Sequence, residues 1–230
     1  MEFRHEFKYL CTEAQIKMLQ SRLRGIMKPD SHAGPSGTYK VRSLYFDDMQ
    51  NTCYYENENG VCPRKKYRIR IYNGQGNVIH LECKRKVRGM TSKKMCTLSR
   101  EQYDILVNRQ SKMHSFDGVP ELMQELLVLI DTKMMRPKVI VEYDRRPFVY
   151  RDGNVRITFD SNISSSSKTE RFFEERICGR PILPVGAQLL EVKYDSFLPD
   201  HIYQILQSDR MQMTTFSKYY LCRKFSDVSF

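Results

Sequence analysis

RKKYRIRIY (64–72), followed closely by LECKRKVRGMTSKK (81–94), is the stretch that decides the fold of this chain. In both segments charged side chains alternate with apolar ones, which is the period-two pattern of a β-strand with one apolar face. The glycines of NGQGN (73–77) between them suit an antiparallel hairpin connection. Residues 64–100 hold twelve Lys and Arg but a single acidic residue, Glu82. The polar face of this hairpin is therefore strongly positive.

The same alternation continues along most of the chain. It predicts eight strands, at residues 2–10, 39–47, 65–72, 77–86, 138–150, 154–160, 189–195 and 216–225. Helices are predicted between them, because Thr12-x-x-Gln15 and Ser99-x-x-Gln102 match the capping box. Two more begin at Pro120 and at Pro199-Asp200, and Ser164–Ser167 is expected to form a mobile loop.

This order of elements indicates the α+β class. We expect a single domain over residues 1–230, built on a mostly antiparallel sheet of about eight strands that closes into a barrel with helices packed outside.

Composition limits the partners and the compartment. The net charge of +11 and the pI near 9.3 favour polyanionic partners such as phosphate compounds, nucleic acid or an anionic membrane. No apolar run approaches the roughly 20 residues that span a bilayer. Seven scattered cysteines without a signal peptide indicate reduced thiols. The sequence thus predicts a cytoplasmic protein without a membrane segment.

The polar faces of the strands suggest where a ligand binds. In an open antiparallel sheet such faces could simply meet water. An ordinary wet face mixes acids, bases and neutral polar residues, however, whereas these faces are mainly Lys and Arg. If helices cover the apolar faces of a barrel, the cations point inward, where they repel one another unless a polyanion binds.

A few carboxylates accompany these inward cations. Glu6, Glu82 and Glu191 each lie two residues from a lysine on the same strand face. They could hold those lysines in place, or bind a divalent metal ion that carries phosphate oxygens. The sequence leaves both roles open.

Eight segments together resemble a known family: RHEFKYL (4–10), VRSLYFDD (41–48), KYRIRIY (66–72), LECKRK with SKK (81–94), EYDRRPF (142–148), VRITFD (155–160), LLEVKYD (189–195) and FSKYY (216–220). In order and over nearly the whole chain, they are similar to the VTC domain, the polyphosphate polymerase module of the vacuolar transporter chaperone. The resemblance implies a triphosphate-tunnel fold related to the CYTH hydrolases. The interior of such a barrel binds nucleoside triphosphate, metal and polyphosphate.

The resemblance also implies roles for particular residues. Cations that would act in catalysis by clamping phosphates are Arg68, Arg70, Lys84, Arg145 and Arg156. Further phosphate contacts would come from Lys8, Lys93 or its neighbour Lys94, Tyr143, Lys193, Ser217 and Lys218. Glu191 would bind the metal ion, Mn²⁺ or Mg²⁺, and Glu6 and Glu82 are the additional metal candidates.

One departure from the related hydrolases narrows the function. Those enzymes open with Glu-x-Glu-x-Lys, and this chain has Arg4-x-Glu6-x-Lys8. A cation in place of the first carboxylate favours the binding of more phosphate over metal-assisted activation of water. We therefore expect a polyphosphate polymerase that transfers the terminal phosphoryl group of ATP to a growing polyphosphate chain.

Three other functions remain possible from the sequence. The first is a tunnel triphosphatase that hydrolyses inorganic triphosphate or a nucleoside triphosphate. The second is a non-catalytic polyphosphate-binding relative. The third, a nucleic-acid-binding barrel, is disfavoured because the cations alternate with core residues and do not lie on exposed loops or helices.

Overall fold

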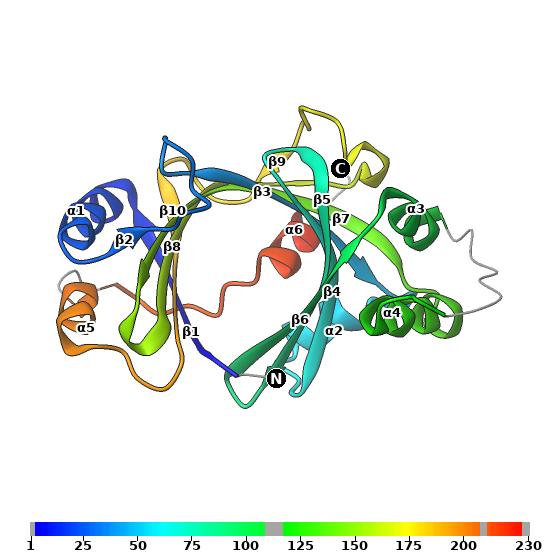
Figure 1. Ribbon diagram of the computed structural model, residues 1–230, viewed down its shortest axis with the longest axis horizontal. Helices are drawn as coiled ribbons and strands as arrows, with labels where there is room; N and C mark the ends of the chain where they lie inside the picture. Colours follow the sequence, from blue (N-terminus) through cyan, green and yellow to red (C-terminus); the bar gives the residue numbers. More distant parts are fainter. Residues whose placement is uncertain (1–2, 109–116, 208–210, 227–230) are drawn as a thin grey trace.

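The computed structural model describes residues 3–108, 117–207 and 211–226. Ten strands form one sheet that curls into a ring, and most of the helices lie outside it (Figure 1). The strands are β1 (His5–Thr12), β2 (Lys28–Pro29), β3 (Tyr39–Asp47), β4 (Arg64–Tyr72), β5 (Gln75–Val87), β6 (Met90–Leu98), β7 (Arg136–Tyr150), β8 (Val155–Ser166), β9 (Arg180–Pro181) and β10 (Ala187–Tyr194). The helices are α1 (Glu13–Arg24), α2 (Thr52–Glu58), α3 (Arg100–Asn108), α4 (Glu121–Lys133), α5 (Asp200–Gln207) and α6 (Lys218–Ser226), with short 3₁₀ turns at Asp152–Asn154 and Thr169–Arg171.

The long strands follow the order β1-β10-β8-β7-β3-β4-β5-β6, and each neighbouring pair is antiparallel. The α+β class and the mostly antiparallel sheet are thus confirmed. Closure of the barrel is only partial, because in the described residues the two edges meet at a single bridge. There Arg4 and Thr91 exchange two backbone hydrogen bonds of 2.9 and 3.0 Å.

Helices cover the outer face of the ring in two groups. α1 and α5 pack together over β1, β8 and β10, and bury Leu19 and Ile202 in one apolar cluster. α3 and α4 cover β5 and β6, and bury Leu106 and Leu126 in another. Because these helices take the apolar faces of the strands, the charged faces are left to the inside of the ring. None of the helices in the described ranges combines the length and the apolar character needed to span a bilayer.

The predicted starts of four helices are confirmed. Thr12 and Gln15 form the complete capping box at α1, and Ser99 and Gln102 exchange the same reciprocal bonds before α3. α4 begins directly after Pro120, and α5 begins at Asp200, directly after Pro199. Among the described residues, the sequence analysis did not predict α2, β6, the two 3₁₀ turns or the two-residue strands β2 and β9.

Two local predictions were wrong. Residues 216–225, expected to be a strand, lead into α6, in which Tyr219 and Cys222 lie three positions apart and are both buried. Ser164–Ser167, expected to be a mobile loop, instead continues β8 as far as Ser166. Gly179 allows this, since a Cβ atom there would come within 2.7 Å of the Ser164 hydroxyl oxygen. The predicted first strand began at Glu2, which lies outside the described residues.

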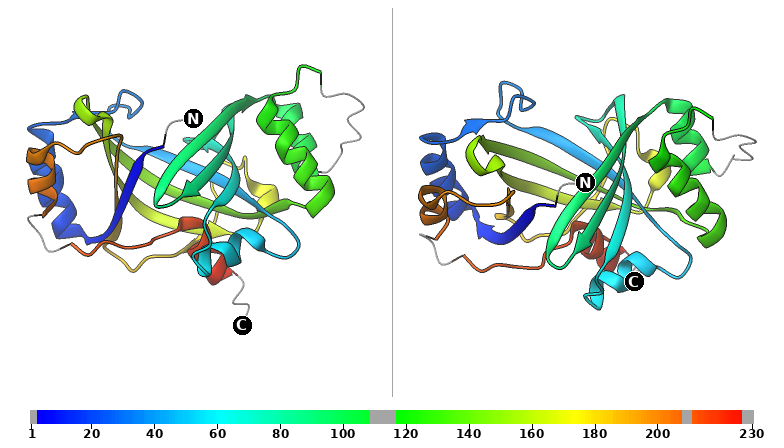
Figure 2. Two further views of the ribbon diagram at one scale, coloured as in Figure 1. Left: turned by 90° about the horizontal axis from the view of Figure 1, so that it is seen from below. Right: turned by 60° about the horizontal axis from the view of Figure 1, so that its bottom comes forward.

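The C-terminal segment gives the ring a closed side. Residues 211–226 cross the ring in the view of Figure 1, and Figure 2 shows that they lie at one end of it. Met213 bridges to Tyr9 of β1, and the backbone N–H of Thr214 donates to the Lys8 carbonyl (2.8 Å). This segment therefore covers one opening of the ring.

A cationic cavity inside the curled sheet

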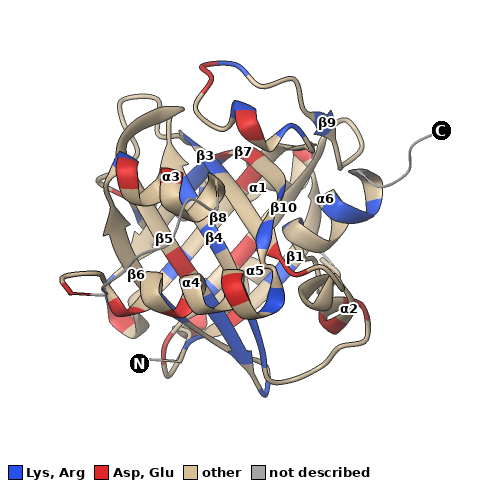
Figure 3. Ribbon diagram, turned by 90° about the vertical axis from the view of Figure 1, so that its right-hand side faces the viewer, with Lys and Arg blue, Asp and Glu red and all other residues tan. Residues whose placement is uncertain are grey.

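The ring encloses a cavity of about 710 Å³. Thirteen of its lining residues are Lys or Arg, and only two are Glu. Figure 3 shows Lys and Arg gathered on the strands at the lower end of the sheet. The lining cations are Arg4, Lys8, Arg64, Lys66, Arg68, Arg70, Lys84, Lys86, Lys93, Arg145, Arg156, Lys193 and Lys218. Every residue predicted for the site lines this cavity except Lys94 and Glu82.

Glu82 lies behind the cavity wall and holds three of the predicted cations. Its side chain is fully buried and accepts from Arg68 (2.8 and 2.7 Å) and Lys93 (3.1 Å), with Arg70 at 3.5 Å. Burial alone would raise the pKa of Glu82, but Arg70, Arg68 and Lys93 hold it well below the usual value. Because Glu82 is buried behind the wall and does not line the cavity, it positions the cavity wall and does not fit the metal role that the sequence allowed.

Glu6 on β1 joins two strands across the gap between the sheet edges. The Nζ of Lys84 on β5 lies 2.5 and 2.8 Å from its two carboxylate oxygens, and the Nζ of Lys8 lies 3.6 Å away. Burial lowers the pKa of Lys84 to about 8, although Glu6 opposes the shift. The protonation of Lys84 therefore depends on the carboxylate of Glu6 beside it.

A third buried cluster joins β7, β8, β10 and α6. Arg145 makes a two-bond contact with Asp160 (2.7 and 2.8 Å) and reaches Glu191 at 3.1 Å, while Lys218 lies 2.6 Å from Asp160. The ring of Tyr143 lies beneath both cations, 5.2 Å from the Arg145 guanidinium carbon and 4.7 Å from the Lys218 Nζ. This cluster places Lys218 in the cavity wall although it comes from a helix.

Tyrosine and serine hydroxyls orient the remaining arginines. Arg68 donates to the Tyr45 hydroxyl (2.8 Å), and Arg70 donates to the Ser43 hydroxyl (3.1 Å). Arg156 donates to the Tyr39 hydroxyl at 3.0 Å and pairs with Asp30 at 2.8 Å. Such fixed guanidinium groups suit bidentate contact with phosphate oxygens.

Glu6 and Glu191 are the two carboxylates that line the cavity, and they contact each other. Burial would raise the pKa of Glu191, but Lys193 and the other neighbours hold it well below the usual value, so Glu191 is ionised. Among the described residues, no group of three or more His, Cys, Asp or Glu could hold a metal ion. Mg²⁺ is nevertheless often held by one or two carboxylates together with substrate phosphates. The pair Glu6 and Glu191 fits that kind of site.

Comparison with known protein families identifies the family of this chain. The family model of the VTC domain matches residues 3–226. This chain belongs to the VTC domain family. Among curated protein sequences, none matches the chain at a significant level.

Solved structures share the fold of this VTC domain. A candidate adenylyl cyclase from Hippeastrum, described as having a dominant triphosphatase activity, is 12% identical with a TM-score of 0.56, over 98% of this chain and 96% of that one. A protein from Pyrococcus horikoshii is 12% identical with a TM-score of 0.51, over 96% and 99% of the two chains. A candidate adenylate cyclase from Bacillus halodurans is 16% identical with a TM-score of 0.50, over 90% and 87%. The fold is therefore the CYTH-like triphosphate-tunnel fold that the sequence resemblance implied.

Lys93 and Lys94 of the VTC domain, which the sequence could not separate, lie on opposite faces of β6. Lys93 lines the cavity and pairs with Glu82 (3.1 Å). Lys94 pairs on the outside with Glu121 of α4 (3.2 Å), whose side chain is 86% exposed. Lys94 therefore lies outside the cavity to which the sequence assigned it, because alternation along the strand turns it outward.

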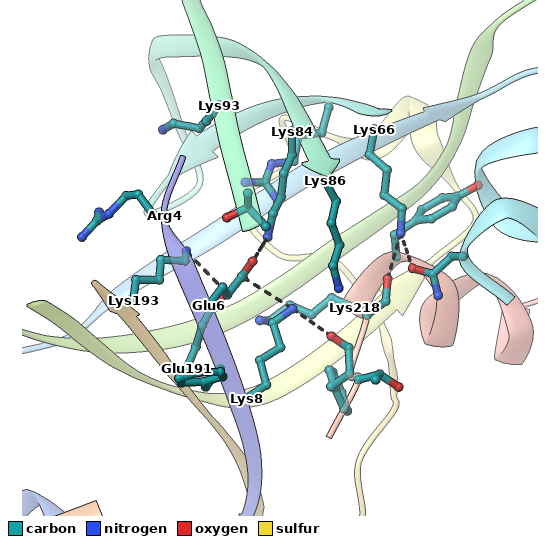
Figure 4. Close-up of a pocket in the computed structure, with 18 of the residues that line it drawn as sticks. Arg4, Glu6, Lys8, Lys66, Lys84, Lys86, Lys93, Glu191, Lys193 and Lys218 are labelled. Atoms are coloured by element: carbon teal, nitrogen blue, oxygen red, sulfur yellow. Dashed lines mark hydrogen bonds and ion pairs between the residues drawn. The ribbon is translucent and has the colours of Figure 1, made fainter. Parts of the chain in front are cut away.

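Besides Arg4, which was considered only as a departure from the related hydrolases, sequence reasoning missed three cations of the cavity, namely Arg64, Lys66 and Lys86. Period two could have found them, since Arg64 and Lys66 share the face of Arg68, and Lys86 shares that of Lys84. In Figure 4, Lys66, Lys84 and Lys86 extend toward the same space as Lys8 and Lys218.

Proposed function

We propose that this VTC domain is a polyphosphate polymerase that transfers the terminal phosphoryl group of ATP to the end of a polyphosphate chain. The observation that carries the proposal is the excess of cations in the cavity, where thirteen Lys and Arg face two Glu. A ligand with many closely spaced negative charges is the natural complement of that surface. ATP and inorganic polyphosphate both have this character.

Phosphoryl transfer to a phosphate acceptor needs little besides position and charge. A terminal oxygen of the chain, already ionised, attacks the γ-phosphorus of ATP. The bond from the γ-phosphorus to the bridging oxygen of the β-phosphate then breaks, and ADP leaves with the bonding electrons. Arg68, Arg70 and Arg145, fixed by Glu82 and Asp160, would hold the equatorial oxygens during this step.

A divalent ion, Mn²⁺ or Mg²⁺, would be held by Glu6 and Glu191 and would neutralise charge on the phosphates when bound. Among the residues that the structure describes, the cavity wall offers neither a histidine nor an unpaired carboxylate to activate water. Its two carboxylates contact each other and pair with cations. At the position where the related hydrolases carry their first carboxylate, Arg4 pairs with Asp195 (2.6 Å). These features favour transfer to phosphate over hydrolysis.

Product analysis tests the proposal. Purified protein incubated with ATP and Mn²⁺ or Mg²⁺ should form polyphosphate that is resolved as a ladder on a gel, together with ADP. Arg70→Ala and Lys84→Ala should abolish synthesis while the circular dichroism spectrum stays unchanged, and Lys94→Ala should behave like the wild type. If orthophosphate were the only product, the protein would be a triphosphatase, like the activity described for the Hippeastrum protein. Wild-type synthesis by either cavity variant would refute the assignment of these cations.

A further inference from the structure

The cations of the cavity fall into two groups that differ in how their charge is compensated. Ten of them lie within 4 Å of a carboxylate, provided by Glu6, Asp30, Glu82, Asp160, Glu191 or Asp195. We call these ten the acid-paired cluster. Arg64, Lys66 and Lys86 have no carboxylate at that distance anywhere in residues 3–108, 117–207 and 211–226. We call these three the acid-free cluster.

The acid-free cluster is compact. Arg64 on β4 lies directly opposite Lys86 on β5, and Lys66 lies opposite Lys84 one step further along the same strands. Like charges directly opposite each other in an antiparallel pair destabilise a sheet. The free protein therefore places three cations without a carboxylate within 4 Å close together in the cavity wall.

Lys66 contacts α2 and the segment that leads into α6. Its Nζ donates to the Asn57 side-chain oxygen of α2 (2.7 Å) and to the Ser217 hydroxyl before α6 (3.0 Å). It also lies 5.3 Å from the centre of the Tyr219 ring. Both hydrogen-bond partners are neutral, so neither compensates the charge of the ammonium group.

The charged and titratable groups around Lys66 oppose its protonation. Burial lowers the pKa of Lys66 to about 7, and Arg64, Lys8 and Lys84 act in the same direction. Cys53 of α2 is the one group among the main contributors that acts in the other direction, and its own pKa is strongly raised by burial. Near neutral pH, Lys66 is therefore close to the midpoint of its titration.

We propose that the acid-free cluster is a second anion subsite, which holds phosphates of the polyphosphate chain beyond those bound by the acid-paired cluster, and that Lys66 takes up a proton when phosphate enters it. The identity of the ligand rests on the proposed function. Burial and the neighbouring cations disfavour the protonated form of Lys66 in the free protein, and a phosphate oxygen would provide the anionic partner that Asn57 and Ser217 do not, so proton uptake is expected. The subsite thereby couples chain binding to pH.

The sign of this coupling is fixed. Below pH 7, Lys66 is already protonated in the free protein. Polyphosphate therefore binds most strongly there, and binding adds few protons at this residue. Above pH 7 the free protein has lost the proton and must regain it, so affinity falls about tenfold per pH unit until the pKa of the complex is reached. The affinity for polyphosphate should therefore fall on the order of tenfold between pH 7 and pH 8.5.

Isothermal titration calorimetry of the full chain with sodium polyphosphate tests this coupling. Titrations at pH 8 in two buffers that differ in ionisation enthalpy give the number of protons taken up. Lys66→Arg keeps a permanent charge at this position, and Lys66→Met removes it. We expect wild-type protein to take up nearly one proton more than either variant. The affinity of Lys66→Arg should fall less steeply between pH 7 and pH 8.5 than that of the wild type, and the remaining dependence comes from Lys84, whose pKa is lowered to about 8. Equal proton uptake by the wild type and Lys66→Arg would overturn the proposal.

The extent of the subsite is tested separately with Lys86→Met, and Lys94→Met is the matched control on the outer face. We expect a several-fold loss of polyphosphate affinity for Lys86→Met and none for Lys94→Met. Equal affinities would remove Lys86 from the subsite. These measurements involve no turnover, so they stand if the protein binds polyphosphate but makes none from ATP. Synthesis from ATP with no contribution of Lys66 to proton uptake would refute the coupling and leave the proposed function intact.

Discussion

The acid-paired cluster and the acid-free cluster line the same cavity but differ in how their cations are held. In the acid-paired cluster, Glu82 and Asp160 hold arginines in fixed positions, so geometry is set before any ligand arrives. In the acid-free cluster, the hydrogen-bond partners of Arg64 and Lys66 are neutral, and the carboxylates that act on Arg64 and Lys86, those of Glu56 and Glu6, lie beyond 4 Å. A buried carboxylate thus fixes the orientation of a cation. Where no carboxylate is close, the positive charge of the side chain is left for a ligand to compensate.

The largest effect should come from breaking the acid-paired cluster at Glu82. Glu82→Gln leaves Arg68, Arg70 and Lys93 without their shared anion, and loss of one partner of a buried ion pair costs about 3–5 kcal/mol. We expect the free energy of unfolding at pH 7, measured with urea, to fall by that order. Glu121→Gln, which removes the exposed partner of Lys94, should change it by less than about 0.5 kcal/mol.

The dependence on pH provides a control for this prediction. Since the pKa of Glu82 is held below its usual value, its contribution is present above the unfolded pKa and is lost as pH falls through the folded pKa. The difference between the wild type and Glu82→Gln should therefore narrow at acidic pH, where the wild-type carboxyl is protonated. A difference that stayed constant down to acid unfolding would show that the ionised carboxylate is not what stabilises this cluster.

A smaller effect should separate the two faces of β6. Lys93→Ala removes a cation of the cavity wall, and Lys94→Ala removes its neighbour on the outside. Because a hydrogen bond to a charged group contributes about 1.5–3 kcal/mol, we expect Lys93→Ala to weaken binding of inorganic tripolyphosphate about tenfold or more. Calorimetry at low salt should show no change for Lys94→Ala, and a comparable loss in both would mean that the outer face also binds phosphate.

This contrast also shows what the sequence could predict. Alternation along a strand is a local property, and it correctly placed Arg68, Arg70 and Lys84 on the inner face of the sheet. The capping boxes are local too, and both were found in the structure. The ion pairs between residues far apart in the chain could not be predicted from the sequence. The contact of Asp160 with Lys218, for example, depends on where α6 packs against β8.

α6 is the element for which local pattern failed. The alternation of aromatic and polar residues in FSKYY (216–220) indicates a strand. A segment this short, however, fits a helix equally well. The spacing of Tyr219 and Cys222 matches one helical face, and the Ser217 hydroxyl accepts from the Tyr220 N–H at the start of the helix. Tertiary packing decided between the two, because the Tyr219 hydroxyl donates to the buried carboxylate of Asp47.

The smallest effect concerns the stability of the fold, which is lowered because the buried ammonium group of Lys66 has no carboxylate partner. In the ligand-free protein, Lys66→Met replaces a desolvated cation by an apolar side chain, so we expect it to stabilise the fold by about 1 kcal/mol at pH 6, or roughly 2–4 °C in the melting temperature. Since the pKa of Lys66 is lowered to about 7, the unfolded chain binds more protons from there up to the usual 10.5, and wild-type stability rises across that window. The wild type gains about 1.4 kcal/mol per pH unit above pH 7, so the advantage of Lys66→Met should disappear between pH 6 and pH 9 in thermal scans. With saturating polyphosphate the order should reverse, because the wild type then gains the binding energy that the variant lacks. A variant less stable than the wild type at pH 6 without ligand would show that the hydrogen bonds to Asn57 and Ser217 compensate the charge after all.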